Sequence, residues 1–275
     1  MDRRMGAPTM KTILFLVSFA MVVLSGSQNG SAQNPPALSR PASPVDGKAW
    51  TNGLGMKFTP AGTPGVLFSV WDVRVKDYAA FVEANPGHDA GTDWKNPGWA
   101  QTPECPVVNV DWNDARAFCQ WLTKKEQAEG ILTAHQQYRL PTDAEWSKAA
   151  GLNESSDGTP KDKDGKFKGV YPWGTEWPPP QGAGNYAETL TRDGFLHTSP
   201  VGSFAANQYG LYDMGGNVWQ WCEDNYDTGD DHRVLRGASW ETLRPDVLES
   251  ASRYLKRPTM RRDCIGFRVV LDVTP

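Results

Sequence analysis

The chain has 275 residues, of which 39% are hydrophobic and 11% aromatic, and its formal net charge at pH 7 is −4. That length and apolar content are sufficient for one sizeable core. The acidic balance supplies no basic field, so nucleic acid is excluded as an expected partner. Twelve tryptophans and 27 glycines indicate a loop-rich domain whose core is packed with aromatic side chains.

The first 32 residues have the pattern of an export signal. Basic residues at Arg3, Arg4 and Lys11 precede an apolar run over 13–24, and small residues follow as far as Ala32. We therefore expect cleavage near Ala32 and an exported, periplasmic or extracellular protein. Met10 is an alternative start, because it opens a signal of ordinary length. The run is shorter than the roughly 20 apolar residues of a spanning helix, so no stable membrane span is expected.

Residues 33–48 are rich in Pro, Ser, Ala and Asn without a hydrophobic period, which is typical of a disordered linker. One domain is predicted over 49–275. Its first strands are expected at 56–60 and 65–74, where β-forming residues cluster.

Apolar residues at helical spacing predict helices over 75–84 and 111–129, the second with Asp111 or Asn113 as its cap and Gly130 as its stop. Thr142 and Glu145 form a capping box that begins a short helix ending near Gly151. The polar segment 152–169 is predicted as an exposed loop. Further strands are predicted at 233–240 and 265–272.

The four cysteines are Cys105, Cys119, Cys222 and Cys264. None belongs to a Cys-x-x-Cys motif, so neither a redox motif nor a zinc knuckle is indicated. An exported protein can form disulfides, and four cysteines allow three pairings that the sequence does not distinguish. One structural disulfide and a set of buried, inert thiols are the two expectations.

Four segments in a fixed order carry a family resemblance. They are 138–146 (YRLPTDAEW), 210–221 (GLYDMGGNVWQW), 236–240 (RGASW) and 266–268 (GFR). Together they resemble the sulfatase-modifying factor family of formylglycine-generating enzymes, over roughly residues 50–272. The resemblance implies an α+β, C-type-lectin-related fold that is low in regular secondary structure and rich in tryptophan.

The resemblance also implies two calcium sites built from hard oxygen ligands. The first takes side-chain oxygens from Asn185 and Asp193 and carbonyl oxygens from Tyr186 and Phe195. The second takes side-chain oxygens from Asp213 and Gln220. Its carbonyl oxygens come from Gly216 and Val218. The family usually has glutamate in place of Gln220, so a neutral amide is expected to weaken this second site.

The family's oxidase centre consists of two cysteine thiolates that bind Cu(I) just after the Gly-Gly-Ser-Trp motif. In this chain Thr242 stands at the first cysteine position, and the second falls within 245–247, where there is no cysteine. A hydroxyl cannot replace a thiolate toward Cu(I), so copper is not an expected cofactor. Trp219 and Ser239 match the residues that flank the centre in active relatives, although both also suit purely structural roles.

Two functions follow from the resemblance. The first is a binding or accessory protein without copper-cysteine oxidase activity, with Trp219, Trp221, Ser239 and Trp240 lining a groove for an extended peptide, a sulfatase-like protein or a glycan. The second is an oxidase with a metal centre that does not use cysteine, acting on a protein cysteine or in siderophore-type oxidation. Glu241 and Asp246 are then the candidate acid and base, although exposed, salt-bridged carboxylates are the plainer expectation.

Eight arginines gather in the last quarter of the chain, among several acidic residues. An anionic ligand is one interpretation, and local ion pairing is the one we favour. Arg253 and Arg268 are expected to anchor the fold from inside.

Overall fold

The computed structural model describes residues 42–190 and 193–274. The predicted export signal and the linker up to residue 41 lie outside these described residues. Within them, no helix has the length and apolar character needed to cross a membrane.

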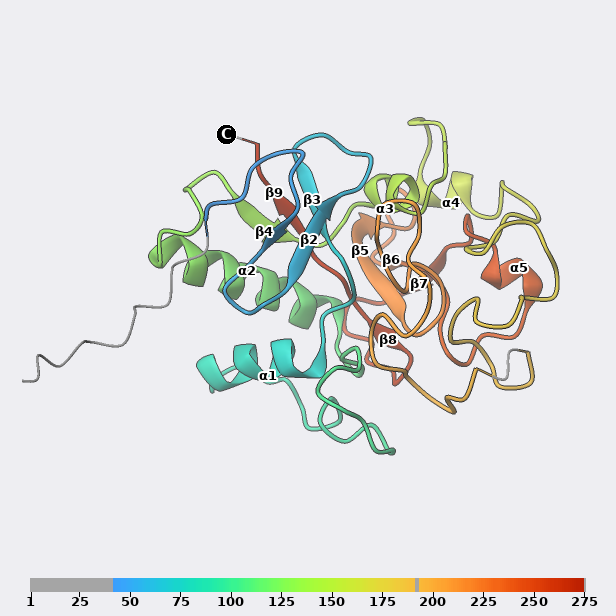
Figure 1. The fold of residues 1–275 in the computed structure, drawn as a ribbon, viewed down its shortest axis with the longest axis horizontal. Coiled ribbons are helices and arrows are strands. Elements are labelled where there is room, and N and C mark those ends of the chain that lie inside the picture. The colour runs from blue at the N-terminus through green and yellow to red at the C-terminus, as the bar shows by residue number, and fades with distance from the viewer. Residues whose placement is uncertain (1–41, 191–192, 275) are drawn as a thin grey trace, which may run out of the picture. The chain divides into compact units, whose positions relative to one another are not determined.

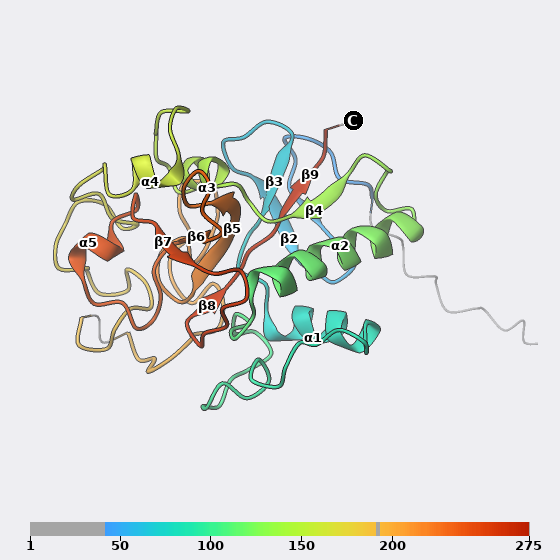
Figure 2. The same ribbon diagram turned by 180° about the vertical axis from the view of Figure 1, so that it is seen from behind.

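A five-stranded antiparallel sheet and two helices form one half of the domain (Figure 1). The strand order is β1-β2-β3-β9-β4, with bounds Trp50–Thr51, Lys57–Pro60, Val66–Ser69, Val270–Asp272 and Gln137–Arg139. Helix α2 (Trp112–Ala128) packs against β4, and α1 (Val75–Ala84) packs against α2 (Figure 2). Glu126 joins these elements, because its buried carboxylate accepts hydrogen bonds from the hydroxyl of Tyr138 on β4 and from the backbone of Gly53.

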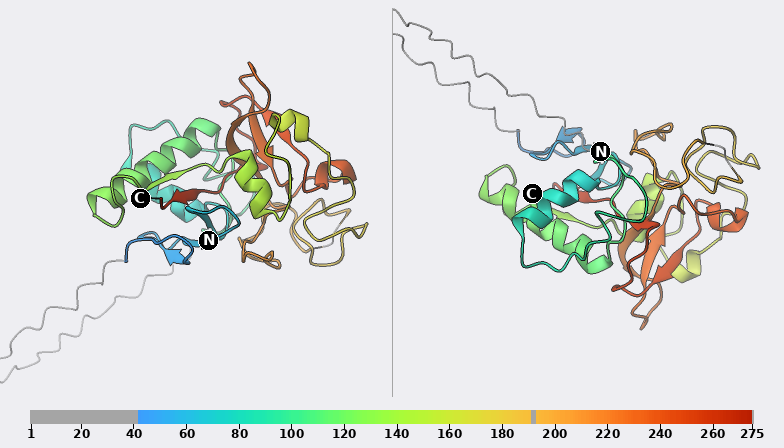
Figure 3. Two further views of the ribbon diagram at one scale, coloured as in Figure 1. Left: turned by 90° about the horizontal axis from the view of Figure 1, so that it is seen from above. Right: turned by 90° about the horizontal axis from the view of Figure 1, so that it is seen from below.

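A four-stranded sheet forms the other half, with the order β7-β6-β5-β8. Figure 3 shows the domain from above and from below. Its strands are Tyr254–Lys256, Arg233–Arg236, Trp219–Asn225 and Ile265–Gly266, and β8 runs parallel to β5. Helix α3 (Asp143–Ala149) packs on β5 and β6, while α4 (Pro160–Lys163) and α5 (Pro245–Leu248) are single turns. Long loops account for most of residues 164–218, as the expected low content of regular structure implies.

The helices agree with the sequence predictions. Asp111 caps α2 by accepting from the backbone of Asp114, and Gly130, which follows the C-cap, has φ +59°. Thr142 and Glu145 form the predicted reciprocal capping box at the start of α3. Inside the segment predicted as an open loop, Thr159 caps α4 through a similar pair with Asp162. That prediction was wrong at this point, because Pro160 at the first helical position favours a helical turn.

Three predicted strands are shorter or divided in the structure. The segment predicted over 65–74 leaves the sheet after Ser69, and the one predicted over 233–240 ends at Arg236, because Gly237 and Ala238 have positive φ values of +96° and +62°. The segment 265–272 supplies β8 to one sheet and β9 to the other. The short connection between β8 and β9 therefore links the two sheets covalently.

The prediction of a disordered linker over 33–48 was wrong for residues 42–48, the part of it that the structure describes. Pro44 is buried, and its carbonyl accepts a hydrogen bond from Gln136. Asp46 accepts from the backbone of Gly65, next to β3. These contacts attach residues 42–48 to the domain.

A buried ionic network lies beneath α3. Asp143 accepts hydrogen bonds from both Arg236 and Arg253, and Arg253 also pairs with Glu154. The two guanidinium groups are fully buried, and the indole of Trp146 lies 4.3 Å from the Arg236 guanidinium. The predicted interior role of Arg253 is confirmed, whereas Arg236 was not expected inside. Burial alone would raise the pKa of Asp143, but these guanidinium groups lower it below its ordinary value.

Candidate functional site

Thr242, predicted to stand at the first missing cysteine position, lies in a tight turn after β6, and the segment 245–247 predicted for the second falls in α5. Ser239 donates its backbone N–H to the hydroxyl of Thr242 over 3.1 Å, and the two side-chain hydroxyls lie 3.3 Å apart. The backbone N–H of Thr242 returns to the carbonyl of Ser239 over 3.0 Å. Both side chains are buried. This turn is stabilised by hydroxyls that satisfy one another, and it presents no thiol.

All four cysteines are free and buried, so the predicted disulfide was wrong and the expectation of buried thiols is confirmed. Cys264 is the cysteine next to the turn, and its Sγ groups with carboxylate oxygens of Glu241 and Asp263 within 4.8 Å. Burial and a hydrogen bond to Glu241 raise the pKa of the Cys264 thiol, which disfavours a thiolate. One protonated thiol does not provide the two soft donors of a Cu(I) site, so the residues present do not fit copper.

The predicted tryptophan groove is divided between the core and the surface. Trp221 is fully buried and donates to the carbonyl of Val110, so its expected place in a ligand groove was wrong. Trp219 and Trp221 are two positions apart in β5 and therefore share a face. Trp219 is also buried, and its ring contacts the partly exposed Tyr254 of β7. Only Trp240 among the three remains half-buried.

Trp240 belongs to a cluster of three rings that the sequence did not reveal. The imidazole of His197 stacks on the indole of Trp99 at 4.2 Å and 7°, and Trp240 contacts both rings edge-on. We call Trp99, His197 and Trp240 the aromatic surface, because all three are only partly buried. The three segments are far apart in sequence, which explains why spacing gave no signal.

The loop of the first predicted calcium site is tied to the Ser239–Thr242 turn. Asn185 donates to the carbonyl of His197, and the backbone of Ala187 donates to the carbonyl of Thr242. The Asp193 carboxylate accepts from the backbone N–H groups of Tyr186 and Phe195, so three of the four residues predicted as ligands contact one another. The side-chain oxygen of Asn185 is buried without a hydrogen-bond partner. An unpartnered buried carbonyl oxygen fits a cation ligand.

The second predicted calcium site has a different environment. The side-chain oxygen of Gln220 already accepts from the indole of Trp146 and from Nε of Arg268, each over 2.8 Å. Arg268 is fully buried, as expected of an internal anchor, and brings a positive charge to the oxygen that a metal would need. Asp213 accepts from the backbone of Gly202. These residues do not fit a second calcium ion.

Gly216 and Val218, the carbonyl donors predicted for the second site, have structural roles. Gly216 has φ +81°, and a Cβ there would lie 2.5 Å from the carbonyl oxygen of Asn185. Its backbone N–H donates to the carbonyl of Gly237. Val218 is fully buried. This glycine allows the two predicted cation loops to approach each other closely.

The proposed acid and base are ordinary surface carboxylates. Asp246 pairs with Arg244, and both side chains are more than half exposed. The hydrogen bond from Arg244 lowers the pKa of Asp246, so the carboxylate is a weak base. Glu241 is exposed beside Cys264.

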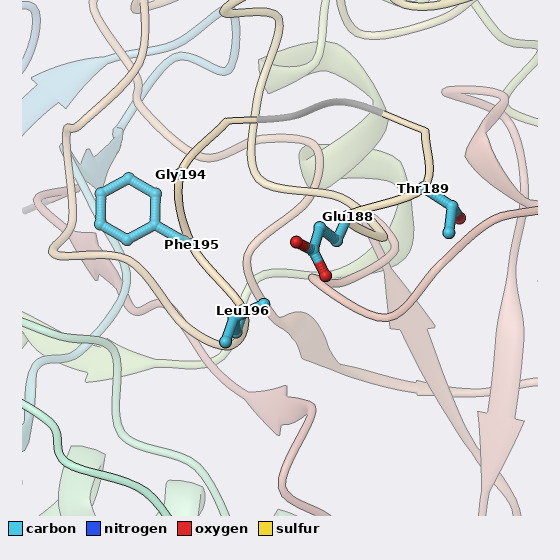
Figure 4. A pocket seen from close by; sticks show the side chains of 5 residues that line it. All are labelled: Glu188, Thr189, Gly194, Phe195 and Leu196. Atoms are coloured by element: carbon cyan, nitrogen blue, oxygen red, sulfur yellow. The ribbon is translucent and has the colours of Figure 1, made fainter.

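A cavity of about 630 Å³ opens in the loop of the first predicted calcium site, lined by Glu188, Thr189, Gly194, Phe195 and Leu196 (Figure 4). Both arms of one loop form it. Because positions 191 and 192 of this loop lie outside the described residues, we assign this cavity no ligand.

The family described as "Sulfatase-modifying factor enzyme 1-like domain" matches residues 63–273, most of the chain. The chain belongs to this family. An "Inactive C-alpha-formylglycine-generating enzyme 2" of Bos taurus is 38% identical over 195 residues, covering 64% of this chain and 54% of the relative. A "Formylglycine-generating enzyme" of Thermomonospora curvata is 38% identical over 147 residues, covering 49% and 40%.

The chain thus spans about half the length of these curated relatives. Similar solved structures confirm the fold. "Treponema denticola variable protein 1" has a TM-score of 0.58 at 23% identity and covers 84% of this chain and all of its own. PvdO from Pseudomonas aeruginosa has a TM-score of 0.56 at 22% identity, with the same coverage. The expected formylglycine-generating-enzyme-like, C-type-lectin-related fold is therefore established.

Proposed function

We propose that this domain is a catalytically silent member of the family that acts as a binding or accessory protein. The observation that carries the proposal is the Ser239–Thr242 turn, where the Thr242 hydroxyl, bonded to Ser239, stands at the first of the two thiolate positions. Among the described residues, two groups could hold a metal ion, Asp230–Asp231–His232 and Glu241–Asp263–Cys264, and neither combines two histidines or two thiols. His88 pairs with Asp114, His197 lies between two tryptophans, and His232 pairs with Asp230. The relative named as inactive supports the same reading.

The aromatic surface is the place where we expect a ligand, either an extended peptide or a glycan. Stacked rings offer a flat apolar face together with polar edges, which suits both classes. The Trp240 indole donates to the carbonyl of Asp263, so the ring is held in place without being buried. As an exported protein, the chain would meet sulfatases or polysaccharides outside the cytoplasm.

Binding to this surface can be measured with two probes, a cysteine-containing sulfatase peptide and a panel of sulfated oligosaccharides. For whichever probe binds, Trp240→Ala is expected to weaken affinity by about 2 kcal/mol, roughly 30-fold, as for a central aromatic contact. Thermal melting of the variant is measured in parallel, because Trp240 is half-buried and packs against the core. Binding that survives Trp240→Ala, or failure of both probe classes, would reject the aromatic surface as the ligand site.

Calcium is proposed at the first site alone. If Asn185, Asp193 and the carbonyls of Tyr186 and Phe195 hold the ion, calcium stabilises the folded state by mass action, by about 2.7 kcal/mol at 100 times its Kd. We expect the melting temperature to rise on adding calcium and to fall on adding EDTA. Asn185→Ala should abolish this response.

Asp213→Asn is the matched control, because it changes a ligand of the second predicted site and leaves the first intact. A calcium response that persists in Asn185→Ala and disappears in Asp213→Asn would contradict the assignment. Elemental analysis of the same samples gives the stoichiometry, for which we expect one calcium per chain.

A further inference from the structure

A second cavity, of about 300 Å³, has Gly215 in its wall and has no role in the function proposed above. Trp173 and Phe204 contribute its aromatic walls, and Asp213 contributes a carboxyl group. The remaining lining is mainly small or apolar. This volume lies at the lower end of the range for small-ligand sites.

The Trp173 wall is held rigidly. Its ring stacks on Tyr171 at 4.9 Å and 2°, meets Tyr186 edge-on at 5.2 Å, and its indole N–H donates to the carbonyl of Glu176. Tyr186 is itself 1% exposed, and its hydroxyl has no hydrogen-bond partner. A Cβ on Gly184 or Gly215, two residues that line the cavity, would lie 3.0 Å from that hydroxyl. An unsatisfied polar group therefore lies just behind the cavity wall.

Asp213 is a buried residue whose charged neighbours are Arg268 and Asp72. The buried guanidinium of Arg268 lies between Asp72 and Asp213. Its Nη2 is 3.6 Å from the Asp72 carboxyl group, and it contacts Asp213 through the backbone carbonyl. Both oxygens of the Asp72 carboxyl are buried without a hydrogen bond. Among the described residues, the Asp213 carboxyl group forms no ion pair, and Asp213 lines the cavity. A cation in the cavity would supply the missing partner.

We propose that this cavity binds an alkylammonium group, with the Asp213 carboxylate as its counter-ion and the Trp173 and Phe204 rings as its walls. Ammonium groups are attracted to aromatic faces and gain more when a carboxylate lies at the same site. The hydrogen bond from Gly202 occupies only one of the two Asp213 oxygens, so acceptor capacity remains. A metal ion is disfavoured, because the nearby Gln220 oxygen is occupied by Arg268.

The test compares n-butylammonium with n-butanol, its neutral counterpart, by following the indole N–H resonance of Trp173 in titrations. We expect the cation to bind at least about tenfold more tightly than the alcohol, as an ion pair against an aromatic wall implies. Asp213→Asn should abolish this preference, since asparagine keeps the shape and tolerates the φ of +55° at this position. Phe204→Ala should weaken binding of the cation.

Leu196→Ala, at an exposed residue outside the cavity lining, is the matched control and should bind n-butylammonium as the parent protein does. N-acetyl-lysine methylamide carries the same ammonium group on a peptide side chain, and its norleucine analogue is the neutral counterpart. Its affinity relative to n-butylammonium shows whether the cavity prefers a peptide side chain or a free amine. Equal binding of cation and alcohol, or unchanged binding in a folded Asp213→Asn protein, would overturn the proposal. Neither result bears on the aromatic surface, because that surface shares no residue with the cavity lining.

Discussion

Replacing Asp143 with alanine is expected to lower the free energy of unfolding by about 3–5 kcal/mol, the range for breaking a buried ion pair by removing one partner. The carboxylate lies between two buried guanidinium groups, and its loss leaves Arg236 without a carboxylate partner. Arg253 keeps Glu154, so its loss is smaller. Urea denaturation followed by tryptophan fluorescence measures the change.

The surface pair of Arg244 and Asp246 provides the control for this experiment. Asp246→Ala removes a comparable contact in solvent and should leave stability unchanged within error. Equal losses in Asp143→Ala and Asp246→Ala would show that the buried network is not a stabilising element.

The pH dependence of the Asp143 contribution has a defined sign. The folded pKa of Asp143 lies below its ordinary value of 3.8, because the guanidinium groups outweigh the effect of burial. Its stabilising contribution is therefore complete above that ordinary value and is lost as the pH falls through the folded pKa. The stability difference between the parent protein and Asp143→Ala should accordingly shrink below about pH 4.

Arg268→Met is expected to be about as damaging, with a loss of about 3–5 kcal/mol. The guanidinium donates to the carbonyls of Ser69 and Tyr212 and to the side chain of Gln220, and it is the charged neighbour of the buried Asp72. Methionine fills much of the space but leaves these acceptors unpaired. The free energy of unfolding in urea is again the measurement.

A second substitution separates the charge from the hydrogen bonds. In an Arg268→Met background, Asp72→Asn removes the stranded carboxylate and should recover part of the loss. In the parent protein, the same substitution breaks the pair from its other side. The two effects should therefore be non-additive in a double-mutant cycle. Strict additivity would mean that Asp72 and Arg268 do not interact.

The helices could be predicted because their signals are local. Apolar spacing and the caps at Asp111 and Thr142 depend on residues within one or two turns, and the structure has both caps. The division of 265–272 between two sheets could not be predicted, because an apolar run does not specify which distant strand it will pair with. The burial of Trp221 could have been predicted, because Trp219 and Trp221 are two positions apart in one strand and form a large apolar pair on one face.

The candidate sites were predicted unevenly for the same reason. The four residues predicted to hold the first calcium ion lie within eleven positions, and Asp193 accepts hydrogen bonds from the backbones of two of them. The second set fails because Arg268, 48 positions beyond Gln220, donates to its oxygen. The aromatic surface combines residues 99, 197 and 240, a contact that depends on tertiary structure alone.

The turn of Ser239 and Thr242 does not provide the two soft donors that a Cu(I) site for cysteine oxidation needs. The direct measurement incubates the purified protein aerobically with Cu(I) and a cysteine-containing sulfatase peptide, then detects aldehyde by hydrazide capture and mass spectrometry. The formylglycine-generating enzyme of Thermomonospora curvata serves as the positive control. We predict that the peptide keeps its thiol with this protein while the control converts it. Catalytic formation of formylglycine by this chain would contradict the account.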